Sequence, residues 1–286
     1  MQKANRFKLI ECPRDAMQGV KQFIPTELKV AYLNLLLQAG FDTLDFGSFV
    51  SPKMVPQMQD TATVLSQLDL SGATQLLAIV ANVRGMEEAV GFEEISYLGF
   101  PFSISETFQQ RNTQASIAES LNTVEQLLDL CRRNNKKPVI YLSMGFGNPY
   151  GDAWSSEIVA HWAKELVDRG AGILSLSDTV GMAKPEQIKN LYTLLANEFA
   201  DTEIGLHLHS TPDIWEEKME AAYAAGCRRM DGALKGFGGC PMAADELTGN
   251  MPTEKMIEYL SRKGENLGLN LDKWQEALVF SANVFH

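Results

Sequence analysis

The chain has 286 residues, a formal net charge of −11, and hydrophobic and charged fractions of 45% and 21%. These proportions are ordinary for a globular enzyme with a large core. The acidic balance disfavours nonspecific nucleic-acid binding, and no run of about 18 apolar residues predicts a membrane helix. The four cysteines form no CxxC pair and no signal-peptide pattern opens the chain, so we expect a reduced, cytoplasmic protein.

Short apolar runs alternate with longer amphipathic segments, and no linker interrupts them. The runs predict strands at residues 7–11, 43–46, 75–80, 94–98, 138–144, 172–177, 203–209 and 229–233. Between them, helical patterns cover residues 26–38, 55–68, 86–91, 116–134, 155–169, 185–199, 213–225 and 253–263. Thr26 and Asp213 occupy expected N-cap positions, and Gly40, Gly170 and Gly226 stand where a glycine ends a helix.

Eight strand–helix units in about 265 residues match the count and size of an α/β fold of the (β/α)8 TIM-barrel type. We therefore predict a single domain over residues 1–286, with a barrel at about 7–263 and a C-terminal helical extension at about 270–286. The extension would pack on the barrel or on another subunit. The alternative, a doubly wound sheet, normally has a glycine-rich phosphate turn after its first strand, which this chain lacks.

Two histidines close the seventh predicted strand. His207 and His209 are two residues apart, so in a strand their side chains point to the same face. The chain has only four histidines, so the pair does not come from a histidine-rich background. Two imidazoles placed this way predict a claw for a divalent metal ion, although two hydrogen-bonded histidines at a strand end would look the same.

Other polar residues gather at the carboxyl ends of predicted strands, where TIM barrels build their active sites. Arg14 and Asp15 follow the first strand, as a permanent cation able to hold negative charge and a hard oxygen ligand. The others are Asp45, Ser175, Asp178, Cys240 and Asn250. Structural alternatives remain open: a hydrogen-bonded structural role for Asp45, a helix-capping turn for Asp178, helix capping for the asparagine, and a buried inert thiol for the cysteine.

Several motifs together resemble the 3-hydroxy-3-methylglutaryl-CoA lyase family of metal-dependent TIM-barrel enzymes. The similarity runs from about Leu9 to Asn270. Its motifs are PRD (13–15), SFVSPK (48–53), VPQM (55–58), Ser105-Glu106 with Asn112, Ser175 with DTVG (178–181), HxH (207–209), GGCP (238–241) and Gly249-Asn250. The SFVSPK and GGCP segments indicate the lyase branch of the superfamily, and we expect the segment from residue 103 to 112 to be a polar loop.

The resemblance implies a role for each matching residue. The metal ligands for Mg²⁺ or Mn²⁺ would be Asp15, His207, His209 and Asn250. Arg14 would stabilise an enolate, Cys240 would transfer a proton from a mobile loop, His207 or an acid would act as base, and Asp45 and Asp178 would be supporting acids. The substrate contacts would be Gln18, Lys21, Ser48, Tyr141 and Ser175. The resemblance further implies an acyl-CoA substrate, a homodimer, and a part in leucine catabolism and ketone-body formation.

The chain departs from the family pattern at a few positions. Asp45 stands where a glutamate is usual, Ser210 replaces an aspartate, and Asn148 replaces a cysteine. The stretch from Cys240 to Asn250 is one residue longer than usual. All the expected metal ligands are present, so the acyl chain of the substrate is what these changes put in question.

We therefore predict a metal-dependent retro-Claisen lyase that cleaves 3-hydroxy-3-methylglutaryl-CoA, or a close relative, to acetyl-CoA and acetoacetate. Two alternatives remain. A Claisen-type synthase of the same superfamily commonly carries a long C-terminal regulatory region, and this chain ends soon after the predicted barrel. A non-catalytic CoA-ester-binding barrel would need neither Arg14 nor Cys240. A biotin-dependent carboxyltransferase needs a strand-end lysine that residues 141–144 do not offer.

Overall fold

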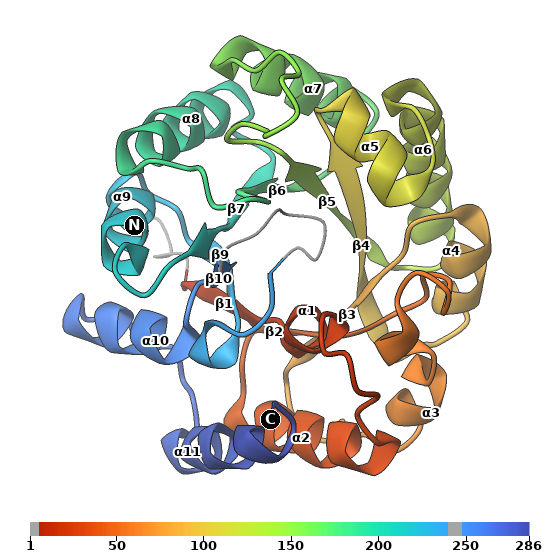
Figure 1. The fold of residues 1–286 in the computed structure, drawn as a ribbon, viewed down its shortest axis with the longest axis vertical. Helices are drawn as coiled ribbons and strands as arrows, with labels where there is room; N and C mark the ends of the chain where they lie inside the picture. Colours follow the sequence, from red (N-terminus) through yellow and green to blue (C-terminus); the bar gives the residue numbers. More distant parts are fainter. Residues whose placement is uncertain (1–5, 240–247, 286) are drawn as a thin grey trace.

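The computed structural model describes residues 6–239 and 248–285 and contains a closed barrel of parallel strands ringed by helices (Figure 1). The barrel strands are β1 (Lys8–Glu11), β2 (Thr43–Ser48), β3 (Gln75–Ile79), β4 (Ile95–Ser103), β5 (Lys137–Ser143), β6 (Ile173–Ser177), β7 (Glu203–His207) and β9 (Arg229–Gly232). They pair in chain order, and β9 closes the ring by pairing with β1 from Lys8–Arg229 to Glu11–Gly232. The predicted (β/α)8 TIM barrel is confirmed.

Each predicted strand coincides with a barrel strand, and its ends lie within two residues of the predicted ones except at the fourth strand. The fourth strand continues to Ser103 because it pairs with β5 as far as Ser103–Ser143. It pairs with β3 only as far as Gly99, so Pro101 lies beyond β3 and its missing N–H removes no bond on that side. The seventh strand ends at His207. His209 belongs to a separate two-residue strand, β8 (His209–Ser210), which pairs antiparallel with β10 (Gly249–Asn250).

The helices alternate with the strands, as the sequence pattern predicts. They are α1 (Pro13–Gln18), α2 (Thr26–Ala39), α3 (Thr61–Leu65), α4 (Val83–Val90), α5 (Glu106–Thr113), α6 (Ile117–Arg133), α7 (Ser156–Asp168), α8 (Pro185–Glu198), α9 (Trp215–Ala224), α10 (Thr253–Arg262) and α11 (Leu271–Phe280). Short 3₁₀ turns are η1 (Pro56–Met58), η2 (Leu234–Gly236) and η3 (Ser281–Asn283). The helix predicted over residues 55–68 is divided between η1 and α3, and the loop predicted over 103–112 contains α5.

Glycines end three helices as predicted, with left-handed φ angles of 84° at Gly40, 102° at Gly170 and 95° at Gly226. The two predicted N-caps are wrong. Pro25 and Ile214 occupy those positions. Thr26 lies inside the helix, where its hydroxyl donates to Asp60 instead of to the helix end.

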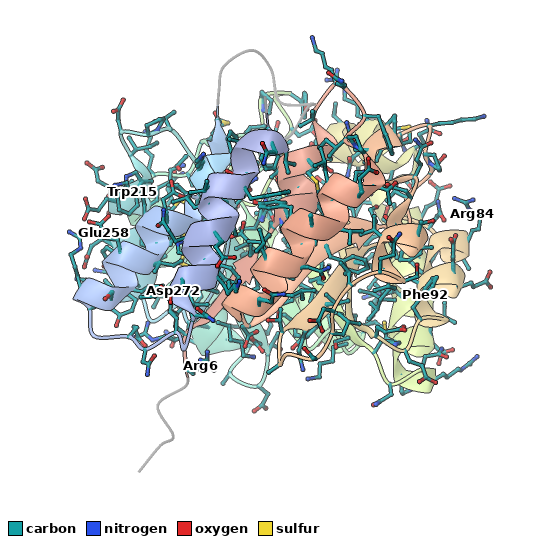
Figure 2. All side chains as sticks on the ribbon, turned by 90° about the horizontal axis from the view of Figure 1, so that it is seen from below. Arg6, Arg84, Phe92, Trp215, Glu258 and Asp272 are labelled. Carbon is teal, nitrogen blue, oxygen red and sulfur yellow. The ribbon has the colours of Figure 1, made fainter. Side chains whose placement is uncertain are left out.

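The C-terminal helix α11 lies alongside α2, the first full helix of the ring (Figures 1 and 2). The edge of Phe41, just after α2, meets the Trp274 ring of α11 with centroids 5.4 Å apart. The extension predicted after the barrel therefore packs on the barrel itself. Among the described residues, no helix has both the length and the apolar character needed to cross a membrane.

Apolar side chains fill two separate layers. The larger layer lies between strands and helices. The smaller layer is inside the barrel and contains Leu77, Tyr97, Val139, Tyr141 and Ile173. Because strand residues two apart share a face, the polar residues in register with this inner layer point into the barrel and toward its mouth.

Candidate active site

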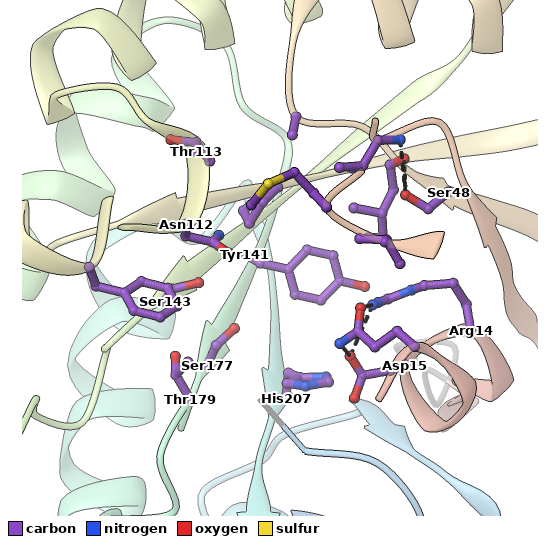
Figure 3. Close-up of a pocket in the computed structure, with 18 of the residues that line it drawn as sticks. Arg14, Asp15, Ser48, Asn112, Thr113, Tyr141, Ser143, Ser177, Thr179 and His207 are labelled. Atoms are coloured by element: carbon purple, nitrogen blue, oxygen red, sulfur yellow. Dashed lines mark hydrogen bonds and ion pairs between the residues drawn. The ribbon is translucent and has the colours of Figure 1, made fainter. Parts of the chain in front are cut away.

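A pocket opens at the carboxyl ends of the barrel strands (Figure 3). Seven of the residues predicted from the sequence line it, namely Arg14, Asp15, Gln18, Ser48, Tyr141, His207 and His209. Asn250 and Asp45 contact lining residues from behind. Cys240 lies outside the described residues. The convergence predicted from scattered strand ends is therefore present in the folded chain.

Arg14 is held by a dense set of hydrogen bonds. Pro13 at the first position starts α1 directly after β1, which turns Arg14 into the barrel mouth. Its Nε donates to Asp45 Oδ2 at 3.0 Å and its Nη2 to the same oxygen at 2.5 Å. Its Nη1 donates to Asp15 Oδ1 at 3.0 Å and to Gln18 Oε1 at 2.8 Å. The guanidinium is therefore oriented before any substrate arrives.

Asp45 lies fully buried beneath Arg14. Burial raises the pKa of Asp45 to about 6, against the opposing effect of the Arg14 charge. Asp45 does not line the pocket, so its contact with any substrate would pass through Arg14. The structure thus places this carboxylate as a support for the arginine.

Asp15 receives donors on both carboxylate oxygens. Gln18 Nε2 donates to Oδ1 at 2.8 Å, and Asn250 Nδ2 donates to Oδ2 at 2.7 Å. Burial acts to raise the pKa of Asp15, but the charges of Arg14, His207 and His209 outweigh it and lower the pKa to about 2. Asp15 is therefore ionised at neutral pH, as a metal ligand must be.

The two histidines converge although they belong to different strands. Their Nε2 atoms lie 3.1 Å apart. The opposite ring nitrogen of His207, Nδ1, lies 3.1 Å from Asp231 Oδ2. Burial acts to lower the pKa of His207, yet the hydrogen bond and charge of Asp231 raise it overall, whereas burial and the neighbouring His207 lower the pKa of His209 to about 3.

Asp15, His207 and His209 fit a divalent cation. One potential ligand atom from each lies within 4.8 Å of the others. Two imidazole nitrogens directed at one another beside an ionised carboxylate form a mixed nitrogen–oxygen donor set that can bind a divalent metal ion. Asn250 presents its amide nitrogen to Asp15 and to the Phe237 carbonyl, so its oxygen would join this set only after a half-turn of the amide.

Asp178 lies away from the pocket lining. Its Oδ2 accepts a 2.7 Å hydrogen bond from Lys218, and its Oδ1 accepts the backbone N–H of Ala183. Burial raises the pKa of Asp178, and the charge of Lys218 opposes that effect. Lys218 also donates to the His209 carbonyl at 2.7 Å, so the pair holds the backbone that carries His209.

Two further predicted substrate contacts also lie away from the pocket lining. Ser175 is buried on β6, and its Oγ has no hydrogen-bond partner among the described residues. Lys21 is exposed in the loop after α1. Neither position tests the role that the family resemblance implies.

Asn148, where a family cysteine is usual, organises the loop after β5. Its Oδ1 accepts the N–H of Tyr150 at 3.0 Å and that of Asp152 at 3.1 Å. Asp152 in turn accepts hydrogen bonds from Ser105 and Thr107 at the start of α5. Asn148 therefore holds Asp152, which links the loop after β5 to the helix that lines the pocket.

Sequence analysis missed several residues at the site. Asp231, Lys218 and the α5 residues Arg111 and Thr113 were not singled out, although two of them line the pocket and the others contact the histidines. Asp231 carried a usable signal, because it is a charged residue two positions after Arg229 in an otherwise apolar strand. Lys218 carried none, since a lysine on an amphipathic helix normally faces solvent.

The barrel and its polar mouth define a class, that of TIM-barrel enzymes with an active site at the strand carboxyl ends. The HMGL-like family model matches residues 7–280, and the chain belongs to this family. It is 33% identical over 275 residues to a protein named mitochondrial hydroxymethylglutaryl-CoA lyase from Rattus norvegicus. The aligned region covers 95% of this chain and 83% of the rat protein. The chain is thus an enzyme of a carbon–carbon lyase family.

Solved structures agree with this assignment. The crystal structure of the Bacillus subtilis HMG-CoA lyase superposes with a TM-score of 0.91 and 31% identity, over 98% of this chain and 94% of that one. An HMG-CoA lyase from Acinetobacter baumannii, in complex with coenzyme A and 3-methylmalate, gives a TM-score of 0.90 and 27% identity, over 98% and 92%. The similarity therefore covers the whole barrel.

Proposed function

We propose that the protein is a divalent-metal-dependent lyase that cleaves 3-hydroxy-3-methylglutaryl-CoA, or a closely related 3-hydroxyacyl-CoA, to acetyl-CoA and acetoacetate. The observation that carries this proposal is the cluster of Arg14, Asp15, His207 and His209 at one wall of the pocket. The names of the most similar relatives support the same substrate.

The reaction needs a base, a place for developing negative charge, and a proton donor. A Mg²⁺ or Mn²⁺ ion held by Asp15, His207 and His209 would supply Lewis acidity that lowers the pKa of the tertiary hydroxyl. Loss of the hydroxyl proton makes acetoacetate as the C–C bond breaks, and the electrons of that bond pass to the thioester as an enolate. A proton then returns to carbon to give acetyl-CoA.

Arg14 suits the enolate charge, because its guanidinium is fixed at the pocket wall and always cationic. The Nδ1 of His207 faces Asp231, so only its Nε2 is left for a metal ion or a proton, and His207 cannot be a metal ligand and the base in the same state. Asp45, with a pKa raised to about 6, also contacts Arg14, but it does not line the pocket, so it would act through the arginine. The proton donor role of Cys240 remains part of the proposal.

The decisive assay is a panel of 3-hydroxyacyl-CoA thioesters with acetyl-CoA and acetoacetate measured as products. We expect equimolar products from 3-hydroxy-3-methylglutaryl-CoA, little turnover of 3-hydroxybutyryl-CoA, whose acyl chain has no free carboxylate, and loss of activity with EDTA that Mn²⁺ restores. Undiminished cleavage after exhaustive chelation would contradict the proposal. Condensation of acetyl-CoA with a keto acid at a rate exceeding cleavage would favour the synthase alternative.

The finer points of the family resemblance stay predictions. They are the choice between Mg²⁺ and Mn²⁺, a homodimer, a cytoplasmic location, and a part in leucine catabolism and ketone-body formation. Titration of activity with each ion and the mass of the protein in solution would test the first two.

A further inference from the structure

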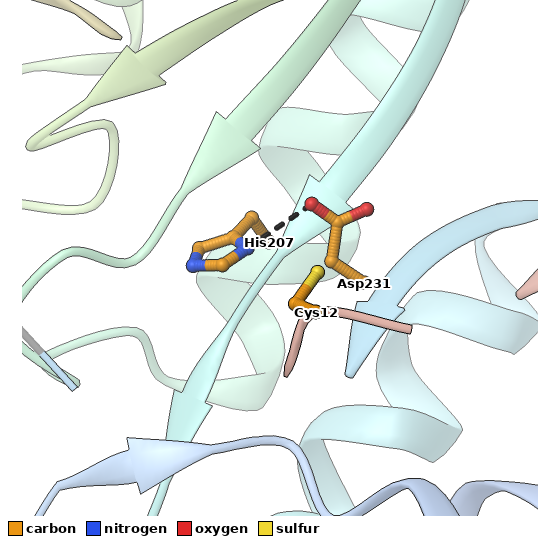
Figure 4. Close-up of side chains that lie close together, drawn as sticks. All are labelled: Cys12, His207 and Asp231. Carbon is orange, nitrogen blue, oxygen red and sulfur yellow. Dashed lines mark hydrogen bonds and ion pairs between the residues drawn. The ribbon is translucent and has the colours of Figure 1, made fainter. Parts of the chain in front are cut away.

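In each candidate histidine ligand, the Nδ1 atom faces away from the metal cluster. These two nitrogens differ in their hydrogen-bond partners. The Nδ1 of His207 meets Asp231 Oδ2 at 3.1 Å (Figure 4). The Nδ1 of His209 is buried and has no hydrogen-bond partner among the residues the structure describes. The protein therefore gives one ring a carboxylate partner and leaves the other without a partner in the described part of the chain.

The contact between His207 and Asp231 is built into the sheet. β7 and β9 are neighbours in the barrel, and their register places His207 directly opposite Asp231. Asp231 is 2% exposed, so water does not compete for its carboxylate. A backbone register fixes this pairing more firmly than two flexible surface side chains could.

A buried cation lies below Asp231 on the same strand face. Arg229 is two residues earlier in β9, and it is also 2% exposed. Gly205 makes room for it, since a Cβ at that glycine would meet Arg229 Cδ at 3.0 Å. Burial acts to lower the pKa of Arg229, but nearby charges, Asp231 first among them, raise it. Arg229 thus stays cationic on the strand face that carries Asp231.

We propose that Asp231 is a positioning residue for the metal site, supported by Arg229. By accepting the Nδ1–H of His207 it holds the neutral ring in the tautomer whose Nε2 lone pair faces His209 and Asp15. A carboxylate behind a ligating histidine fixes the tautomer and raises the basicity of the ligand. The inference rests on the proposed function, because it assumes that His207 binds a metal ion.

The first test reads the tautomer without any metal or substrate. In protein labelled with ¹⁵N-histidine, at alkaline pH where the rings are neutral, the four histidines give a tractable nitrogen spectrum. We expect His207 of the wild type to carry its proton on Nδ1 and Asp231→Asn to move it to Nε2, because an amide nitrogen can donate to Nδ1. Cys12→Ala is the matched control, since Cys12 lies in the same buried cluster (Figure 4) and should leave the tautomer unchanged.

The second test measures the affinity for Mn²⁺ alone. Asp231→Asn should weaken Mn²⁺ binding by about 10- to 100-fold, while Cys12→Ala should stay near the wild-type value. An Nε2–H tautomer in wild-type His207, or a folded Asp231→Asn variant with unchanged tautomer and affinity, would overturn the inference. Absence of any Mn²⁺ binding by the wild type would instead contradict the proposed metal dependence, and the tautomer experiment would still judge Asp231.

Discussion

The barrel interior holds two buried arginines in opposite circumstances. Arg14 at the mouth donates to Asp45, Asp15 and Gln18 through all three of its nitrogens. Arg229, deeper in the barrel, makes no hydrogen bond within the described part of the chain; its nearest acid is Glu203 at 3.5 Å, and its guanidinium lies 5.6 Å from the Tyr97 ring centroid.

The difference separates two uses of a buried charge. A fully bonded guanidinium is rigid and needs no reorganisation when negative charge develops beside it. An unbonded one has lost its hydration without replacement, which costs stability. We infer that Arg14 acts in the reaction, and that Arg229 is retained despite its cost in stability because its positive charge acts on Asp231.

The largest effect on activity should come from replacing the hydrogen-bonded arginine, Arg14. Arg14→Met should lower kcat by on the order of 10²- to 10⁴-fold with a smaller change in KM, because the enolate charge develops mainly in the transition state. Steady-state kinetics on the thioester measures this. The double variant Arg14→Met/Asp45→Asn is the control, since it removes the unpaired buried carboxylate. An increase in KM alone would show that Arg14 only binds substrate.

Lys218 extends the comparison to a third buried cation, which donates to Asp178, Gly181 and His209. Lys218→Met should destabilise the protein by about 3–5 kcal/mol, because Asp178 would keep an uncompensated buried charge. Urea unfolding gives the free energy. Lys218→Met/Asp178→Asn should recover part of the loss, and a single variant as stable as the wild type would show that the pair contributes little.

Glu11 adds a buried acid to this comparison of buried charged groups. Its carboxylate accepts hydrogen bonds from Leu234 N–H and the Thr253 hydroxyl, and burial raises its pKa to about 8. The folded state therefore holds this proton more tightly than the unfolded chain, so stability should fall as the pH rises from about 4.5 to 8, by a few kcal/mol at about 1.4 kcal/mol per pKa unit. Glu11→Gln should remove most of this slope in melting temperature, and an unchanged slope would assign it to other groups.

The smallest effect should come from replacing Arg229, the arginine without hydrogen bonds in the described part of the chain. Arg229→Met should change the melting temperature by no more than about 2–4 °C, because removal of a desolvated charge favours folding while the loss of the counter-charge of Asp231 opposes it. The same variant should bind Mn²⁺ less tightly, because Asp231 loses its counter-charge. Lys8→Met is a comparison variant at the barrel floor, where Lys8 pairs with Glu203 in partial contact with solvent. A larger fall in the melting temperature of Arg229→Met would show that its charge stabilises the fold.

The sequence predicted the eight barrel strands because each is a short apolar run between longer amphipathic segments. It failed where pairing partners decide the outcome. Pro101 stands inside β4 only because β3 has already ended, and His209 leaves the barrel because Asn250, far along the chain, pairs with it. α5 was missed because its residues are mostly polar and only one face meets the pocket.

The same holds for the site: the residues at strand ends could be predicted from the sequence, but their tertiary partners could not. Arg14, Asp15, His207 and His209 could be predicted, because strand-end positions in a parallel barrel converge whatever the details of packing. The support around them could not. The pairing of Asp178 with Lys218 and that of His207 with Asp231 depend on which helix and which strand become neighbours.

The short β8–β10 ladder has a consequence for measurement. It joins the backbone of His209 to that of Asn250, whose side chain reaches Asp15, so protein hydrogen bonds already set the spacing of the candidate ligands. Ion binding then adds to the free energy of unfolding as RT ln(1 + [ion]/Kd), about 2.7 kcal/mol at 100 times Kd. The melting temperature of the protein would thus report the free ion concentration around it, and the measurement needs no substrate.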